Sequence, residues 1–152
     1  MAVINLPSLH GGQLAIIKNA TRWNHVCCGR RWGKTYMLAR LTVESVLRGE
    51  YVGIFCPQYK FLTEIYREIY DILSPMKLES SKTEGVIRAP TKGRVDFWSL
   101  ENEACGRGRK YHRVLIDEAA FAKNGTMTPI WERAIIDRKS TRLNSSHITI
   151  SY

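Results

Sequence analysis

A lysine and a threonine in this sequence have the spacing and surroundings needed to bind phosphate. Lys34 and Thr35 follow a basic turn bounded by two glycines, which reads Gly29-Arg30-Arg31-Trp32-Gly33. An apolar run precedes this turn and an amphipathic pattern follows it, which is the strand–loop–helix context of a phosphate-binding loop. Its backbone N–H groups and the helix N-terminus attract phosphate oxygens, while Lys34 reaches the outer phosphates and Thr35 holds Mg²⁺. The pattern requires glycine at position 28, where the chain has Cys28, so a glycine-rich turn with an incidental lysine is the alternative.

Two adjacent carboxylates follow another apolar run further along the chain. Asp117 and Glu118 come directly after Val114-Leu115-Ile116, which predicts a buried strand ending at the acidic pair. Asp117 can position Mg²⁺, directly or through water, and Glu118 can polarise an attacking water. Alone, an apolar run ending in Asp-Glu is more often a helix-capping pair. Together with the loop, and in this chain order, the pair indicates nucleotide hydrolysis.

The elements that must position these residues follow an alternating pattern. Apolar runs predict strands near residues 23–28, 51–56, 86–89, 94–100 and 111–116, and helical patterns cover residues 13–19, 34–48, 60–73 and 130–136. This alternation favours an α/β fold with a mostly parallel sheet and helices on both faces. Ligands bind beyond the carboxyl ends of the strands in such sheets, and both the loop and the acidic pair lie at such ends.

The composition sets further bounds. The 152 residues suffice for one domain, and the formal net charge of +9 fits a polyanionic partner as well as a merely basic surface. The four cysteines form no C-x-x-C pair and are expected to be reduced. The scattered His10, His25 and His112 lack the spacing of metal ligands. No apolar run approaches the ~20 residues that cross a bilayer, so no membrane association is expected.

The order of these motifs resembles that of the large terminase subunit of tailed bacteriophages, the ATP-driven motor that packages viral DNA into a procapsid. The resemblance rests on Gln13, on G-R-R-x-G-K-T at residues 29–35, on C-P-Q-Y at residues 56–59, on R-G at residues 107–108 and on L-I-D-E-A-A at residues 115–120. It implies a P-loop NTPase fold with ATP and Mg²⁺ as cofactors. It also accounts for Cys28, because this family often lacks the first glycine of the loop.

The resemblance implies individual roles for the residues that bind ATP and metal. Gln13 would read adenine, with an exposed helix glutamine as the alternative. Thr35 and Asp117 would hold Mg²⁺, and Glu118 would be catalytic. The ATP-binding set is Gln13, Gly29, Arg30, Arg31, Trp32, Gly33, Lys34 and Thr35.

Two arginines are further catalytic candidates under the same resemblance. Arg30 would sense or neutralise the γ-phosphate, with Arg31 as the competing residue. Arg107 would enter the site of a neighbouring subunit, with Arg109 as its competitor and a solvated basic loop as the alternative. These basic residues, with Lys110 and Arg113, can instead contact DNA phosphates. The three tyrosines of the helical pattern at residues 60–73 and just before it, Tyr59, Tyr66 and Tyr70, are interpreted as core rather than as a base-stacking platform.

The resemblance also implies partners and a location. These are double-stranded viral DNA, the portal and the small terminase subunit, in a homo-oligomeric ring in the cytoplasm of the infected bacterial host. Two other functions stay open at this point. One is a helicase-like DNA-remodelling ATPase, and the other is a P-loop module that binds nucleic acid without turnover.

Residues 137–152 break the pattern. They are rich in serine, threonine and asparagine, and they resemble the translation of a sequencing-library adapter. The sequence therefore predicts a partial ATPase domain at residues 1–136 followed by an artefactual or disordered tail. The family's domain continues with further strands and a coupling motif, and a nuclease domain follows it. We expect this chain to lack them, to leave apolar sheet edges exposed, and to be marginally stable with weak ATP binding at best.

Overall fold

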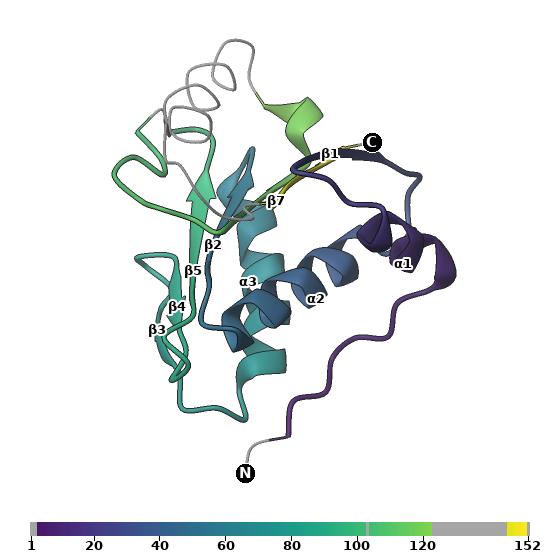
Figure 1. The fold of residues 1–152 in the computed structure, drawn as a ribbon. Helices are drawn as coiled ribbons and strands as arrows, with labels where there is room; N and C mark the ends of the chain where they lie inside the picture. The colour runs from purple at the N-terminus through teal and green to yellow at the C-terminus, as the bar shows by residue number, and fades with distance from the viewer. Residues whose placement is uncertain (1–2, 103, 123–145, 152) are drawn as a thin grey trace.

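A computed structural model describes residues 3–102, 104–122 and 146–151, which form one sheet with helices against it (Figure 1). The helices are α1 (Gly11–Lys18), α2 (Lys34–Leu47), α3 (Tyr59–Leu73) and the short 3₁₀ helix η1 (Ala119–Phe121). The strands are β1 (Trp23–Cys27), β2 (Tyr51–Cys56), β3 (Glu79–Ser81), β4 (Val86–Arg88), β5 (Arg94–Ser99), β6 (Arg113–Asp117) and β7 (Ser146–Ser151).

The sheet has seven strands in the order β1-β7-β6-β2-β5-β4-β3. The first five run parallel to their neighbours, whereas β4 pairs antiparallel with both β5 and β3. Parallel strands buried on both faces are continuously apolar, and β2 is buried at every position after Tyr51. The predicted α/β fold with a mostly parallel sheet is therefore confirmed.

Helices α2 and α3 pack against each other and against β2 and β5, on one face of the sheet. The apolar residues of α3 recur at helical spacing, so its buried positions lie on one side of the helix. The core of this face includes the fully buried Met37, Leu38, Val43, Val46, Val52, Ile54, Ile69, Leu73, Ile87, Val95 and Leu115. Helix α1 contributes the half-buried Ile16 and Ile17 to the same core, so α1, α2 and α3 all contribute to one core.

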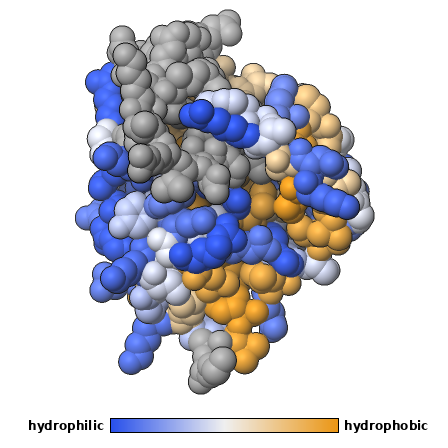
Figure 2. All heavy atoms as spheres, in the orientation of Figure 1, coloured by the Kyte–Doolittle hydropathy of each residue, from blue (hydrophilic) through white to orange (hydrophobic). Residues whose placement is uncertain are grey.

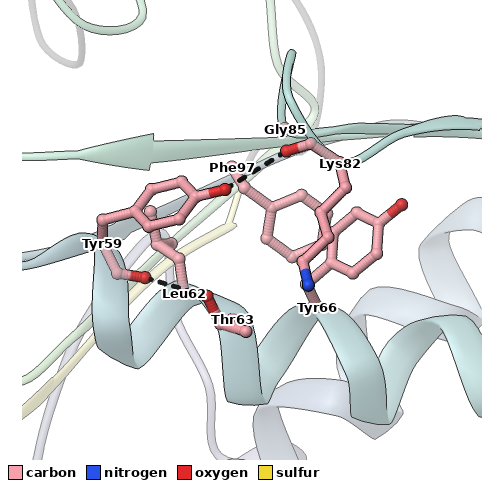
Figure 3. Close-up of a pocket in the computed structure, with 7 residues that line it drawn as sticks. All are labelled: Tyr59, Leu62, Thr63, Tyr66, Lys82, Gly85 and Phe97. Carbon is pink, nitrogen blue, oxygen red and sulfur yellow. Dashed lines mark hydrogen bonds between the residues drawn. The ribbon is translucent and has the colours of Figure 1, made fainter.

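The first residue of α3, Tyr59, forms a hydrogen bond with the β3–β4 hairpin (Figure 3). The Tyr59 hydroxyl donates to the Lys82 carbonyl oxygen over 3.3 Å, and the Tyr66 ring lies 5.1 Å from that of Phe97. The cavity between them is about 10 Å³, far below the several hundred Å³ of a ligand site. This geometry agrees with the interpretation of Tyr66 as a packing residue, although Tyr59 and Tyr70 are 52% and 38% exposed.

The opposite face of the sheet carries a second apolar cluster. It contains the buried residues Phe55, Leu100, Cys105, Val114 and Ile116. In the described part of the chain it is covered by Trp98, Tyr111, Ala119 and Ala122 rather than by a long helix. A polar network lies within it, because the Tyr111 hydroxyl donates to Asp96 over 2.9 Å and accepts from Trp98 Nε1 over 2.7 Å.

Two strands differ from the sequence prediction. The three-residue β3 was not expected, because Glu-Ser-Ser has no apolar residue to mark it. Residues 146–151 form β7, which pairs with β1 on one side and β6 on the other, inside the segment predicted to be a tail. The helix predicted at residues 130–136 lies outside the described residues, and the division at residue 136 stays a prediction.

Cys27, Cys28, Cys56 and Cys105 are all free cysteines in the structure. Among the helices in the described part of the chain, none combines the length and the apolar character that crossing a membrane requires.

Candidate functional site

The loop after β1 has the backbone shape of an anion-binding turn. Arg31 and Gly33 both adopt left-handed conformations, with φ of 59° and 87°. Gly33 is the N-cap of α2 and has no side-chain cap hydrogen bond, so the first N–H groups of this 14-residue helix face the loop without a capping side chain. Lys34 is 7% exposed, and Thr35 is half-buried beside it. The loop therefore presents helix N–H groups together with an ammonium and a hydroxyl group.

Helix α1 contacts this loop through the side chain of Gln13, which is 3% exposed. Its Nε2 donates to the carbonyl oxygens of Gly33 at 2.9 Å and Trp32 at 3.3 Å, and its Oε1 accepts from the His10 N–H at 3.0 Å. The predicted adenine-reading glutamine thus lies at the loop, where its side chain fastens the loop backbone to α1.

His10, which the sequence analysis considered only as a metal ligand, is a member of the site. Its Nδ1 accepts from the Gly12 N–H at 3.2 Å, so in the neutral ring Nε2 carries the proton and donates to the Trp32 carbonyl oxygen at 3.1 Å. The His10 and Trp32 rings also meet edge to face, with centroids 4.7 Å apart. The signal in the sequence was the spacing of a capping box, with histidine in place of serine or threonine and Gln13 three residues later.

The sheet brings the acidic pair to the level of the loop. Val26 on β1 and Asp117 on β6 both pair with Ile150 on β7, so the three residues form one row across three strands. Adjacent strands lie about 4.8 Å apart, which puts the backbones of Val26 and Asp117 about 10 Å apart. The loop begins just beyond Val26, and Glu118 directly follows Asp117. The two predicted halves of the site thus lie at one edge of the sheet.

Asp117 interacts with the charges of both Glu118 and Lys34. Asp117 is 6% exposed, and burial together with the charge of Glu118 raises its pKa to about 6. The charge of Lys34 and a hydrogen bond from the Glu118 N–H, 3.0 Å from Oδ1, act in the opposite direction. Burial also raises the pKa of the Cys28 thiol, which the charge of Lys34 lowers and that of Asp117 raises. Position 28, where the loop pattern requires glycine, is therefore within electrostatic reach of both.

Glu118 is held in an unusual conformation. Its backbone is left-handed, with φ of 54° and ψ of 37°, at the N-cap of η1. Such a conformation costs a non-glycine residue about 1–2 kcal/mol. Its Oε2 is buried and has no hydrogen-bond partner among the residues that the structure describes. A buried acceptor without a donor is suited to a water or another proton donor that arrives with a ligand.

The predicted arginines lie in two places. Arg30 and Arg31 are both exposed in the loop. Arg107 is exposed in the turn after Cys105, and its backbone N–H donates to the Ala104 carbonyl oxygen over 3.3 Å. The Arg109 Nε lies 3.9 Å from Asp96 Oδ2, on the sheet. Within the described residues no hydrogen bond or ion pair joins Arg107 to the acidic pair.

The residues present fit a magnesium ion bound with phosphates. In the described ranges no three His, Cys, Asp or Glu side chains gather as a metal site. Mg²⁺ at nucleotide sites needs only one or two protein ligands, because phosphates and waters supply the others. The hydroxyl of Thr35 and the buried carboxylate of Asp117 can supply that number, and a cation would favour the charged form of Asp117 that burial disfavours.

A family comparison identifies the protein class. The profile described as "Terminase large subunit, T4likevirus-type, N-terminal" matches residues 26–149, which is most of the chain and includes the loop and the acidic pair. The chain belongs to this family of terminase large subunits. The match includes β6 and reaches into β7. Among curated protein sequences, none matches the chain.

Solved structures of large terminases share the fold. The ATPase domain of the Thermus phage P74-26 large terminase superposes with a TM-score of 0.76 at 20% identity, covering 95% of this chain and 64% of that one. The HK97 bacteriophage large terminase gives 0.77 at 13% identity, with 95% and 33% covered. A large terminase from a thermophilic bacteriophage in complex with ADP gives 0.67 at 11% identity, with 95% and 39% covered. This chain therefore spans less than two thirds of each of these terminase chains.

Proposed function

We propose that this terminase chain is the ATP-binding and ATP-hydrolysing part of a phage DNA-packaging motor, which couples hydrolysis to translocation of double-stranded DNA into a procapsid. The main observation behind the proposal is the row that sets Asp117 level with Val26, at the start of the phosphate-binding loop. The ADP bound to one of the similar large terminases supports nucleotide binding here.

In this proposal the loop binds the triphosphate of ATP. The N-terminal N–H groups of α2 face the phosphates, Lys34 neutralises the outer ones, and Arg30 or Arg31 contacts the γ-phosphate from the exposed side. Thr35 and Asp117 would hold Mg²⁺, which when bound would neutralise the charge of the phosphates. Gln13 keeps the loop backbone in place through its two carbonyl contacts, and we keep adenine recognition as its second proposed role.

Glu118 is the residue we assign to the attacking water. Its backbone N–H donates to Asp117 Oδ1 over 3.0 Å, and its buried Oε2 has an unused acceptor position. A water bound there would be oriented toward the γ-phosphate and would lose its proton to the carboxylate. Phosphoryl transfer depends mainly on such positioning and on charge neutralisation, so a buried carboxylate next to Asp117 suits the reaction.

The remaining parts of the motor require other chains. We propose that Arg107, which is exposed and has no contact with the acidic pair of its own chain, acts in the site of a neighbouring copy in a homo-oligomeric ring. Arg109 is the weaker candidate, because it lies near Asp96 on the sheet. Double-stranded viral DNA, the portal and the small terminase subunit are the proposed partners, in the cytoplasm of the infected bacterial host.

Binding of a fluorescent ATP analogue to the purified chain tests the first half of this proposal. We expect Mg²⁺-dependent binding, a loss of about tenfold or more in Lys34→Ala, and no change in Lys60→Ala, which removes an exposed lysine of α3. An affinity for the analogue that changes neither on removal of Mg²⁺ nor in Lys34→Ala would contradict the assignment of the site.

Hydrolysis by the complete gene product tests the second half. Glu118→Gln should keep ATP binding while kcat falls about 10²–10⁴-fold. DNA binding without hydrolysis in the unmodified protein would favour a non-catalytic module, and unchanged hydrolysis in both Lys34→Ala and Glu118→Gln would remove the catalytic assignment.

A further inference from the structure

A row of side chains crosses the sheet at the end opposite the nucleotide site. Glu79 on β3 pairs with Arg88 on β4, Arg88 pairs with Arg94 on β5, and Arg94 pairs with Tyr51 on β2. Residues directly opposite one another on paired strands project from the same face of the sheet. Arg94 donates to Asp96 Oδ1 over 2.6 Å, which places the row on the face that carries Tyr111 and not on the face covered by α2 and α3.

This row lines a cavity of about 510 Å³. The other lining residues include Lys77, which precedes β3, and Lys92, in the turn between β4 and β5. In Figure 2 the side of the molecule formed by β3 and β4, at the left of the view, is mostly hydrophilic. The cavity is therefore large enough for a ligand, and the charged residues that line it are four cations and one carboxylate.

Of the four cationic side chains around the cavity, three have no ion-pair partner among the described residues. Among the residues that the structure describes, Lys77, Arg88 and Lys92 make no ion pair or side-chain hydrogen bond, and all three are exposed. Only Arg94 is neutralised, by the buried Asp96. One exposed carboxylate, Glu79, faces the group and leaves it positively charged.

Arg88 lies opposite Arg94 on β5 and opposite Glu79 on β3, and Asp96 pairs with Arg94. Like charges directly opposite each other on paired strands repel, whereas an anion between them reverses the sign of the interaction. Two guanidinium groups on strands about 4.8 Å apart can donate together to one phosphate. The positions of Lys77 and Lys92 to either side extend the positive surface beyond the reach of a single small anion. A chain of phosphates satisfies all of these cations at once.

We propose that this surface, the basic row of Lys77, Arg88, Lys92 and Arg94, binds the phosphate backbone of a nucleic acid. Naming double-stranded DNA as that nucleic acid rests on the proposed function. The exposed ring of Tyr51, 42% accessible at the end of the row, adds a flat surface beside the sugar–phosphate chain. The row lies one strand length from the loop, roughly 17 Å along β2, so DNA and nucleotide bind at opposite edges of one sheet.

Fluorescence anisotropy of a labelled DNA duplex, measured without nucleotide over a series of salt concentrations, tests this assignment. The double variant Arg88→Ala/Lys92→Ala should lose on the order of tenfold in affinity, and its slope of log K against log salt should fall by about 2. The matched control is Lys60→Ala/Arg67→Ala, which removes the same two charges from exposed positions of α3 on the other face. It should change neither quantity.

Several outcomes would overturn the proposal. Equal losses in the row variant and the control would show only a general effect of net charge. A loss confined to Arg107→Ala/Lys110→Ala would move the DNA contact to the turn beside β6. If inorganic phosphate stabilises the unmodified chain more than the row variant while DNA affinity is equal, the cavity binds small anions instead. A change in sedimentation with unchanged DNA affinity would assign the row to an acidic surface of a neighbouring copy.

The result is separable from that of the nucleotide experiment. The row variant leaves the loop and the acidic pair intact, so its binding of the ATP analogue should equal that of the unmodified chain. Loss of thermal stability is not expected either, because Arg88 and Lys92 are exposed, and Arg88→Ala removes both a like-charge neighbour, Arg94, and an opposite-charge neighbour, Glu79.

Discussion

The side-chain amide of Gln13 donates to the carbonyl oxygen of Gly33 over 2.9 Å and fills the space that a Cβ at position 33 would take, since it lies 2.6 Å from that point. Gly33 also has a φ of 87°, which favours glycine. The loop conformation and the position of α1 therefore depend on each other.

Replacement of Gln13 by alanine should weaken ATP binding by on the order of tenfold, because two loop carbonyls lose their donor and the loop is no longer held in its binding shape. Affinities for ATP and GTP analogues, measured by fluorescence titration, separate its two roles. Anchoring of the loop predicts equal losses for both, whereas adenine recognition predicts a loss for ATP alone. Gln58→Ala is the control, because Gln58 is exposed and makes no cap hydrogen bond.

Asp117 should make the stability of the metal-free chain depend on pH. Burial raises its pKa from 3.8 to about 6, so between these values the folded chain keeps a proton that the unfolded chain releases. The free energy of unfolding therefore falls as the pH rises through this window, by at most about 3 kcal/mol. Urea unfolding in the presence of a chelator should show this fall. Asp117→Asn should abolish it and Asp71→Asn, at an exposed position of α3, should preserve it; a fall that persists in Asp117→Asn would assign it to another group.

The left-handed backbone of Glu118 predicts an unusual order of stabilities. Glycine is free of the strain that alanine bears at a φ of 54°, so Glu118→Gly should be more stable than Glu118→Ala by about 1 kcal/mol. Both variants lack the carboxylate, and neither should hydrolyse ATP. The same two substitutions at Glu64, inside α3, should give the opposite order by about 1 kcal/mol. Chemical denaturation measures all four, and an alanine variant at position 118 as stable as the glycine variant would refute the strain.

The hydroxyl of Tyr111 should contribute to stability through the polar network on the second face. Tyr111→Phe leaves Asp96 Oδ2 without its donor and Trp98 Nε1 without its acceptor, which should cost about 1–3 kcal/mol. Tyr70→Phe is the matched control, because that ring is 38% exposed and stacks on Tyr66 through its aromatic face. Equal unfolding free energies for the two variants would exclude a structural role for the network.

The sequence was sufficient to predict the bounds of the helices and strands that have strong apolar patterns. β2 and α2 lie within one residue of their predicted bounds because a fully buried strand and a helix between a loop and a glycine leave clear signals. β3 has no apolar residue, and residues 146–151 lie in a serine- and threonine-rich segment, so their pairing depends on neighbouring strands that a sequence pattern does not reveal.

The candidate site was predictable only in part for a similar reason. The types and order of Lys34, Thr35, Asp117 and Glu118 indicated their chemistry, and the sheet brings the loop and the acidic pair to one edge. The contact of Gln13 with Gly33 is a tertiary contact, absent from any local spacing. The opposition of Arg88 and Arg94 depends on strand register, which no local pattern of the two strands specifies.

The position of β7 determines when the nucleotide site can assemble. In the described part of the chain β1 pairs with β7 alone, and Trp23 lies opposite His147 in that pairing. Pairing at such a sequence separation forms late in folding, because a long segment must be closed first. During synthesis, the core between α2, α3, β2 and β5 can form on the ribosome while β1 still has no strand beside it. Competence to bind ATP should therefore appear only after residues 146–151 have emerged.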